Sequence, residues 1–193
     1  MTDLLLEAEH YVEQYLKLFL PKTRCFHTFA TTRFIVECCE ELAAANDLPW
    51  PEAEALFMAA WFHGTAYCRL GDSRIDGSVR IAAEFLADRD LSSDFSDQVA
   101  RLIRSTREGA SPSSLLEKLL TDARHRYLAL PHYAIISQFI RQELKLSEQI
   151  LYSDEEWKER NIRVLTIHQY CTSYALEHWD HQKRVNLSEL MSG

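Results

Sequence analysis

Two polar residues stand inside apolar helical stretches, where each needs a chemical reason. His63 ends the stretch from Ala53 to Phe62, which is apolar on nearly every helical face, and it directly precedes Gly64. Asp122 follows Leu119 at helical spacing, so its carboxylate shares the inward stripe of its helix. A carboxylate buried there needs a partner. His63 can be a core histidine bonded to a carbonyl and Asp122 a capping or ion-paired residue, or both can be donors of a functional site.

The elements that must position these residues are predicted to be helices. The chain has 193 residues with only 5 Gly and 5 Pro, and so few turn residues are typical of helical proteins. Apolar periodicity, with Leu5, Val12, Leu16 and Phe19 inward in the first helix, predicts an all-α bundle in a single domain. The expected helices span 3–20, 26–45, 51–63, 78–88, 94–106, 114–128, 133–150, 154–170 and 173–190. Ser113 and Ser153 are the expected caps of two of them, and 64–77, with Gly71, Asp72 and Ser73, is an expected loop.

Charge and cysteine usage exclude several classes of partner and location. The net charge of −8 disfavours nucleic acids and anionic membrane surfaces, although a local basic pocket remains compatible with it. No run of 18 apolar residues exists, and the N-terminal segment is acidic, unlike a secretion signal. Five cysteines without a Cys-x-x-Cys pair favour reduced thiols and a cytoplasmic protein.

Four segments in order carry a resemblance to a known family. The chain resembles the HD-domain superfamily of metal-dependent phosphohydrolases, most closely its small bacterial members known only as predicted hydrolases. The matching segments are Phe26-His27-Thr28-Phe29-Ala30-Thr31-Thr32, Ala59-Ala60-Trp61-Phe62-His63-Gly64-Thr65-Ala66-Tyr67, Leu119-Leu120-Thr121-Asp122-Ala123-Arg124, and Trp157 with parts of 174–187. The resemblance implies an HD-like helical bundle over 1–193, with the motif-bearing core at about 22–130 and C-terminal helices at about 133–190 packed on it.

Carried over residue by residue, the resemblance implies a degraded metal site. Thr31 stands where the family has its first histidine ligand, and Gly64 stands where it has the aspartate of its His-Asp doublet. His63 and Asp122 occupy the two ligand positions that survive. A divalent ion needs several converging nitrogen and oxygen donors, so two alone bind weakly. No cofactor is therefore expected, unless His27, one turn before Thr31, supplies a third ligand or a general acid for bound Fe, Mn, Zn or Mg.

Arginines stand at two further positions where the family has a histidine and an aspartate. These are Arg74 and Arg124, and Arg101, Arg104 and Arg107 lie on the helix leading toward them. A guanidinium can bind a phosphate group without a metal. We therefore expect a metal-independent site for a phosphorylated small molecule or nucleotide, with Arg74, Arg124 and His27 as its residues. The alternative is that these arginines are solvated.

Three functions remain open from the sequence. The favoured one is a non-catalytic HD-like protein that binds a phosphorylated small molecule or a protein partner. The second is an active metal-dependent phosphohydrolase on a nucleotide or phosphate ester, with His63 and Asp122 as ligands of a rearranged site. The third is a structural or oligomerising helical protein, and the chain can form a homo-oligomer in any of the three cases.

Overall fold

The computed structural model describes residues 2–68, 74–89, 91–107 and 109–192, and these residues form helices and connections without a strand. The all-α fold predicted from periodicity is confirmed. The α-helices are α1 (Asp3–Phe19), α2 (Phe29–Ala45), α3 (Trp50–His63), α4 (Arg74–Ala87), α5 (Ser93–Ser105), α6 (Leu115–His125), α7 (Tyr133–Glu143), α8 (Asp154–Ile167), α9 (Ser173–His178) and α10 (Asp180–Ser192). Three short helical segments join them: η1 (Gly64–Cys68), η2 (Arg126–Ala129) and η3 (Leu144–Glu148).

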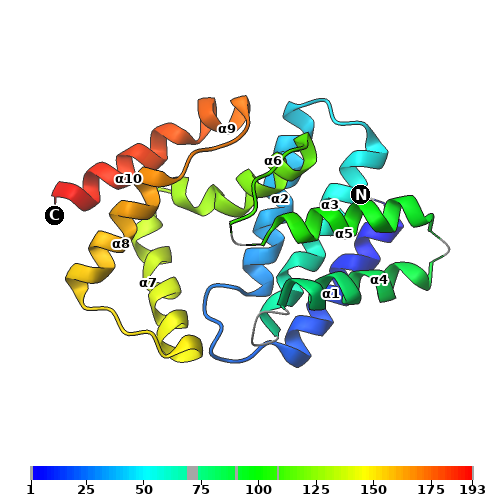
Figure 1. The fold of residues 1–193 in the computed structure, drawn as a ribbon, viewed down its shortest axis with the longest axis horizontal. Helices are drawn as coiled ribbons and strands as arrows, with labels where there is room; N and C mark the ends of the chain where they lie inside the picture. Colours follow the sequence, from blue (N-terminus) through cyan, green and yellow to red (C-terminus); the bar gives the residue numbers. More distant parts are fainter. Residues whose placement is uncertain (1, 69–73, 90, 108, 193) are drawn as a thin grey trace.

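Helix α3 forms the centre of the main core. Every residue from Ala55 to His63 is buried, as a helix that is apolar on all faces requires. Helices α1, α2, α4 and α5 pack around it, and α6 packs against α2 (Figure 1). The C-terminal end of α3, with His63, therefore lies where these helices meet.

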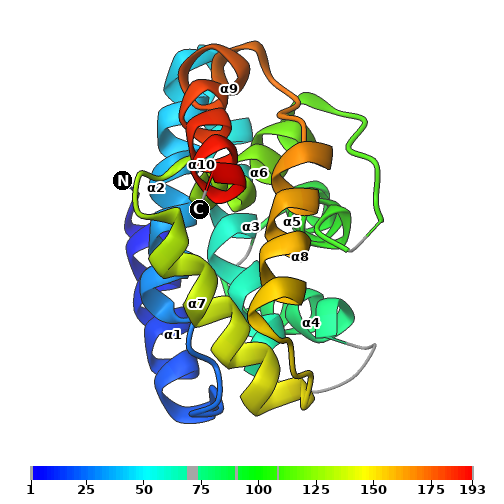
Figure 2. The same ribbon diagram turned by 90° about the vertical axis from the view of Figure 1, so that its left-hand side faces the viewer.

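The C-terminal helices form a second, smaller cluster beside the main core. Leu128, Tyr133 and Leu165 form its buried centre. Helices α7, α8 and α10 lie on one side of the α1–α5 group, and the view turned by 90° has them in front (Figure 2). Polar contacts fix α10 in place, since buried Asn186 donates to the carbonyl oxygens of Leu128 and Leu130 at 2.8 and 3.0 Å.

Side-chain caps set the start of several helices. Ser153 and Glu156 form a capping box at the start of α8, so the predicted Ser153 cap is confirmed. The predicted Ser113 cap is wrong by one residue. Ser114 is the N-cap of α6 and forms the box with Glu117, while Ser113 donates to the same carboxylate.

Several boundaries differ from prediction, for local physical reasons. Helix α2 begins at Phe29 rather than 26, because Thr28, with extended backbone, is its N-cap and accepts from the N–H of Thr31. The N–H groups of Phe26 and His27 before it donate to a carboxylate from α7. Part of the expected loop 64–77 is helical, as η1 and the start of α4. The expected loop residues Gly71, Asp72 and Ser73 lie outside the described residues. The expected last helix is two helices that meet at Trp179.

One apolar residue of α1 differs from the prediction in its burial. The prediction has Phe19 inward, but it is exposed, while Leu5, Val12 and Leu16 are buried as predicted.

No helix in the described part of the chain is both long and apolar enough to cross a bilayer.

Candidate functional site

His63 is held as a neutral imidazole at the end of α3. Its side chain is buried, and Nδ1 lies 2.6 Å from the carbonyl oxygen of Ala60. A carbonyl only accepts, so Nδ1 carries the proton and Nε2 keeps its lone pair. Burial, reinforced by the nearby charge of Arg124, lowers the pKa of His63 to about 3. The carbonyl-bonded histidine that the sequence allowed is thus the arrangement present.

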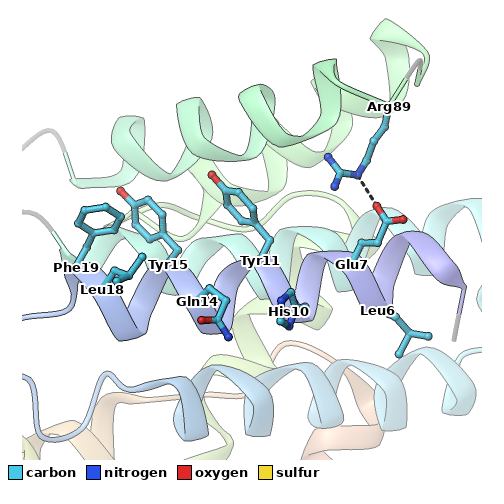
Figure 3. Close-up of a pocket in the computed structure, with 9 residues that line it drawn as sticks. All are labelled: Leu6, Glu7, His10, Tyr11, Gln14, Tyr15, Leu18, Phe19 and Arg89. Carbon is cyan, nitrogen blue, oxygen red and sulfur yellow. Dashed lines mark hydrogen bonds and ion pairs between the residues drawn. The ribbon is translucent and has the colours of Figure 1, made fainter.

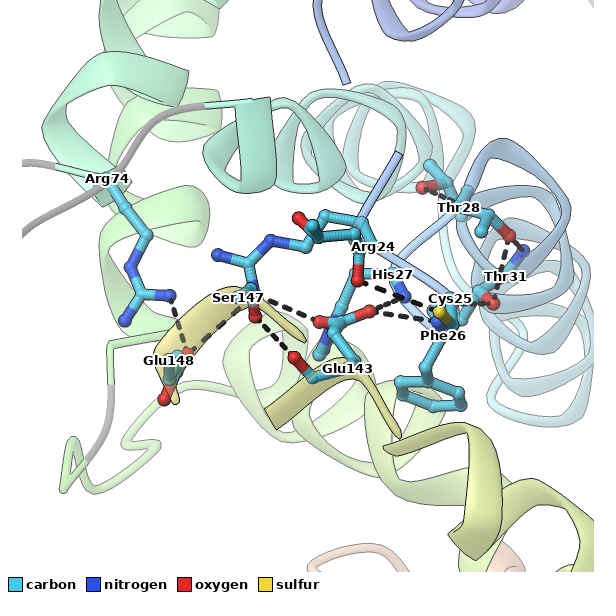
Figure 4. Close-up of polar contacts among 12 residues, drawn as sticks. Arg24, Cys25, Phe26, His27, Thr28, Thr31, Arg74, Glu143, Ser147 and Glu148 are labelled. Atoms are coloured by element: carbon cyan, nitrogen blue, oxygen red, sulfur yellow. Dashed lines mark hydrogen bonds and ion pairs between the residues drawn. The ribbon is translucent and has the colours of Figure 1, made fainter. Parts of the chain in front are cut away.

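His27 lies in the segment before α2 and is fixed by Glu143 from the end of α7. Its Nδ1 lies 2.5 Å from Glu143 Oε1, and the backbone N–H groups of Phe26 and His27 donate to Oε2 at 2.8 and 3.0 Å. Arg24 donates to Oε1 from the same segment at 3.0 Å. Figure 4 shows these groups converging on one buried carboxylate.

The protonation of this pair follows from its contacts. Burial would raise the pKa of Glu143, but the hydrogen bonds from His27 and the backbone lower it to about 2. Burial lowers the pKa of His27, with Glu143 opposing the shift. We therefore assign an ionised Glu143 that accepts from Nδ1–H of a neutral His27. The His27 ring also stacks on Tyr67, with ring centroids 3.6 Å apart.

Thr31 and Gly64 occupy the positions where the resemblance implies lost ligands, and neither offers a donor to a metal ion. The hydroxyl of Thr31 donates to the carbonyl oxygen of Phe26. A Cβ atom at Gly64 would lie 2.3 Å from Oγ1 of Thr32, which is well inside contact distance. Thr32 on α2 therefore fills the space that a carboxylate at position 64 would enter.

Asp122 is buried on α6 and both of its oxygens are hydrogen-bonded. Oδ1 accepts from the backbone N–H of Cys171 at 2.7 Å, and Oδ2 accepts from the N–H and hydroxyl of Thr172 at 2.8 and 2.7 Å. Burial raises the pKa of Asp122 while these bonds oppose the shift. The carboxylate anchors the start of α9, where Thr172 is the N-cap. This is the capping role that the sequence offered as the simpler interpretation.

Arg124 lies on the other side of α6 from Asp122, because two residues along a helix turn the side chain by about 200°. Its guanidinium donates to the carbonyl oxygen of Thr106 at the end of α5, at 3.0 Å. Its charge contributes to lowering the pKa of His27 and His63, after burial. Of the two acid positions that the resemblance implies on this helix, the one on the side of α5 therefore carries an arginine.

Three arginines from separate elements line one pocket of about 600 Å³. Arg74 begins α4, Arg107 follows α5, and Arg124 lies on α6. The other described lining residues are Ala66, Tyr67, Ile75, Ser105, Thr106, Gly109, Ala110, Thr121 and His125. The structure thus brings the predicted pair Arg74 and Arg124 together with Arg107, whereas Arg101 and Arg104 are exposed and outside the described lining.

The pocket's arginines have weak acidic partners. Arg74 lies 3.7 Å from Glu148 and Arg107 lies 3.3 Å from Asp76, in solvent-accessible pairs that contribute little. Within the described chain, Arg124 is in no ion pair. The first residues of α4 also line the pocket, so the positive end of that helix dipole faces the same space.

The described residues do not fit a metal ion at the positions implied by the resemblance. Both oxygens of Asp122 accept hydrogen bonds from the residues at the start of α9, and Thr31 and Gly64 offer no ligand. Across the described ranges, no three His, Cys, Asp or Glu side chains come together as a metal site.

Sequence reasoning missed three residues that shape this region. Glu143 and Arg24 lie 119 positions apart, and no local pattern pairs them. A charged residue inside the apolar periodicity of 133–150 was the one available signal for Glu143. His125, at the end of α6, lines the pocket and has its pKa lowered to about 4 by burial and by Arg124.

No protein-family model, no curated protein and no solved structure matches this chain.

Proposed function

We propose that this protein binds a phosphorylated small molecule, without a metal ion, in the pocket between α4, α5 and α6. The observation that carries the proposal is the convergence of Arg74, Arg107 and Arg124 on one pocket in a chain whose net charge is −8. Three cations from separate segments that line one space raise its positive potential and attract an anion, and the solvent-accessible pairs with Glu148 and Asp76 offset little of it.

The chemistry of the pocket supports a phosphate ester over a bare anion. Guanidinium groups donate two parallel hydrogen bonds to phosphate oxygens, and the dipole of α4 adds to their field. A volume of about 600 Å³ is in the range of small-molecule sites and exceeds what one phosphate needs. Tyr67, Ile75 and Ala66 give the rest of such a ligand an apolar surface.

Arg124 has the most direct role in this proposal. It is anchored by the Thr106 carbonyl, so less side-chain entropy is lost when it binds an anion. A ligand phosphate would compete with Glu148 for Arg74 and with Asp76 for Arg107, and both pairs are weak enough to exchange. His27, which the sequence analysis expected as a third binding residue, is outside the described lining of the pocket and stacks on Tyr67, which lines it.

The resemblance to the HD-domain superfamily belongs to the same proposal. It implies a pocket for phosphate esters near His63, and we infer that Arg124 supplies there the positive charge that a metal supplies in the family. The phosphohydrolase alternative has no comparable support, because the described donors do not converge. A cytoplasmic location stays an expectation from cysteine usage.

Calorimetric titration with pyrophosphate and with ATP, in the presence of a chelator, tests the proposal. We expect the wild-type chain to bind at least one of these probes. Arg124→Gln should weaken binding roughly tenfold or more, since a charge-assisted hydrogen bond to phosphate is lost, and Arg74→Gln should weaken it less. Arg80→Gln, on the exposed face of the same helix as Arg74, is the matched control and should bind like wild type.

Two kinds of result would overturn the proposal. One is a failed binding test: either the wild type binds neither probe, or Arg74→Gln and Arg124→Gln both bind with unchanged affinity. The other is near-stoichiometric metal in chelator-free protein, measured by elemental mass spectrometry, that disappears in His63→Ala. That second result would favour the hydrolase instead.

A further inference from the structure

The outer face of α1 carries an open groove that shares no described lining residue with the arginine-lined pocket. Two rows of residues at four-residue spacing line it: Leu6, His10, Gln14 and Leu18 in one, and Glu7, Tyr11, Tyr15 and Phe19 in the other, with Arg89 at one end. Its volume is about 710 Å³. Figure 3 shows the tyrosines and Phe19 pointing toward one side of the groove and the other row toward the opposite side.

The groove is bordered by apolar side chains that nothing in the described chain covers. Leu6, Leu18 and Phe19 are 50, 73 and 56% exposed. Such residues on one helix, rimmed by charges, mark an interaction surface more often than a free surface. The core contact of α1 is made by Leu5, Val12 and Leu16, which are buried, whereas Leu6, Leu18 and Phe19 stay exposed.

Six exposed residues of α1 are arranged symmetrically about residue 12, in the pairs Leu6 and Leu18, Glu7 and Lys17, and His10 and Gln14. Placed against a second α1 running antiparallel with a two-fold axis at that point, Leu6 meets Leu18 of the second copy and His10 meets its Gln14. Glu7 meets Lys17 of the second copy, an attractive pair that the symmetry makes twice. A parallel arrangement would set Glu7 against Glu7 and Lys17 against Lys17. Charge therefore selects the antiparallel register.

We propose that α1 is the interface of an antiparallel homodimer, with a second copy of this chain seated on the groove. Such an interface is isologous, because the same surface serves both copies. The apolar pairs Leu6–Leu18 lie toward the two ends and the polar pair His10–Gln14 near the axis. The Glu7–Arg89 ion pair at 2.8 Å keeps Glu7 extended along the groove edge. The inference is independent of the proposed ligand.

Sedimentation equilibrium of the full chain over a dilution series tests the proposal. We expect the wild type to reach twice the mass of the 22.4-kDa chain. The double variant Leu6→Gln/Leu18→Gln should weaken the dimer by roughly a hundredfold or more, because four leucines leave the interface. Both positions are exposed within one chain, and Gln is a good helix former, so the fold should persist.

The matched control is Leu151→Gln/Leu176→Gln. These leucines are 73 and 48% exposed, close to the values of Leu18 and Leu6, but lie away from α1. This variant should dimerise like wild type. A wild type that stays monomeric, or equal weakening in both double variants, would overturn the proposal.

A charge variant tests the register. Lys17→Glu places two acidic side chains opposite each other at both ends of the interface and should weaken the dimer roughly tenfold at low salt. Added salt should recover much of that loss, because it screens repulsion between exposed charges. An unchanged dimer in Lys17→Glu would rule out the antiparallel register.

Discussion

At the scale of single residues, Gly64 and Thr32 are complementary in shape. The resemblance implies an aspartate at position 64, yet the backbone there approaches α2 so closely that even a Cβ atom meets the Thr32 hydroxyl. Thr32 is buried, and its hydroxyl is bonded to the Thr28 carbonyl at 3.1 Å. An aspartate at position 64 would therefore clash with Thr32. The substitution Gly64→Asp alone would not create a metal ligand.

We expect Gly64→Ala to lower the free energy of unfolding by about 1–3 kcal/mol, the usual cost of inserting a methyl group into a packed core. In a Thr32→Ala background, the same change should cost much less, because the hydroxyl and methyl group nearest the new Cβ are gone. Chemical denaturation of the four chains in this double-mutant cycle gives the coupling. Equal costs in both backgrounds would show that Thr32 does not close the position.

At the scale of elements, buried polar groups tie segments that are distant in sequence. Asp122 joins α6 to the start of α9, and Glu143 joins the end of α7 to the segment before α2. Each carboxylate accepts hydrogen bonds from backbone N–H groups that would otherwise be buried without partners. The helices themselves could be placed from apolar periodicity, but these ties could not, since they depend on residues 49 to 119 positions apart.

Asp122→Ala should lower the free energy of unfolding by about 2–4 kcal/mol and loosen α9, because three donors from Cys171 and Thr172 lose their acceptor. Hydrogen exchange at the amides of 171–178 should speed up more than exchange in α3.

This prediction also separates an anchoring role of Asp122 from a metal-ligand role. If Asp122 were a metal ligand instead, hydrogen exchange in α9 would be the same in Asp122→Ala as in the wild type. Added Mn²⁺ would then stabilise the wild type but not Asp122→Ala. Glu143→Ala, which removes the other buried carboxylate, is the control and should loosen residues 24–28 without changing α9.

At the scale of the whole molecule, the sequence predicted the helical class and most helix positions, because a chain with little Gly and Pro and strong apolar periodicity has few other folds open to it. It also singled out Arg74 and Arg124, which share one pocket. The inward side of Asp122 followed from its place in the apolar stripe of α6, but its partners Cys171 and Thr172 could not be predicted. Nor could the sequence show that Arg124, two residues further on, lines a pocket with Arg74 and Arg107.

Three histidines make the whole fold sensitive to mild acid. Burial is the first cause that lowers the pKa of His63 to about 3, of His125 to about 4 and of His168 to about 3. Arg124 adds to the shift at His63 and His125, and His125 and Lys183 add to it at His168. Since each folded-state pKa lies below the ordinary 6.5, the unfolded chain takes up these protons first as the pH falls.

The free energy of unfolding should therefore be nearly constant above pH 7 and fall as the pH drops from 6.5 toward 4, by about 4 kcal/mol per pH unit from these three if they titrate together. His27, whose pKa is also lowered, adds to the loss. Glu143 adds to this loss only below its ordinary pKa of 4.5, down to about 2.

His168→Phe should reduce the pH slope that these three histidines contribute by about a third, because one proton fewer is taken up on unfolding. Neither ring nitrogen of His168 has a partner among the described residues, so this variant should also be at least as stable as wild type at pH 7. Urea denaturation at pH 7, 6 and 5 measures the slope, with the exposed His178→Phe as control. If the free energy of unfolding of the wild type did not change between pH 7 and 5, the prediction would be wrong, because these three histidines would be solvated in the folded chain. The packing of α6 against the start of α9 would then have to be looser than the three hydrogen bonds to buried Asp122 require.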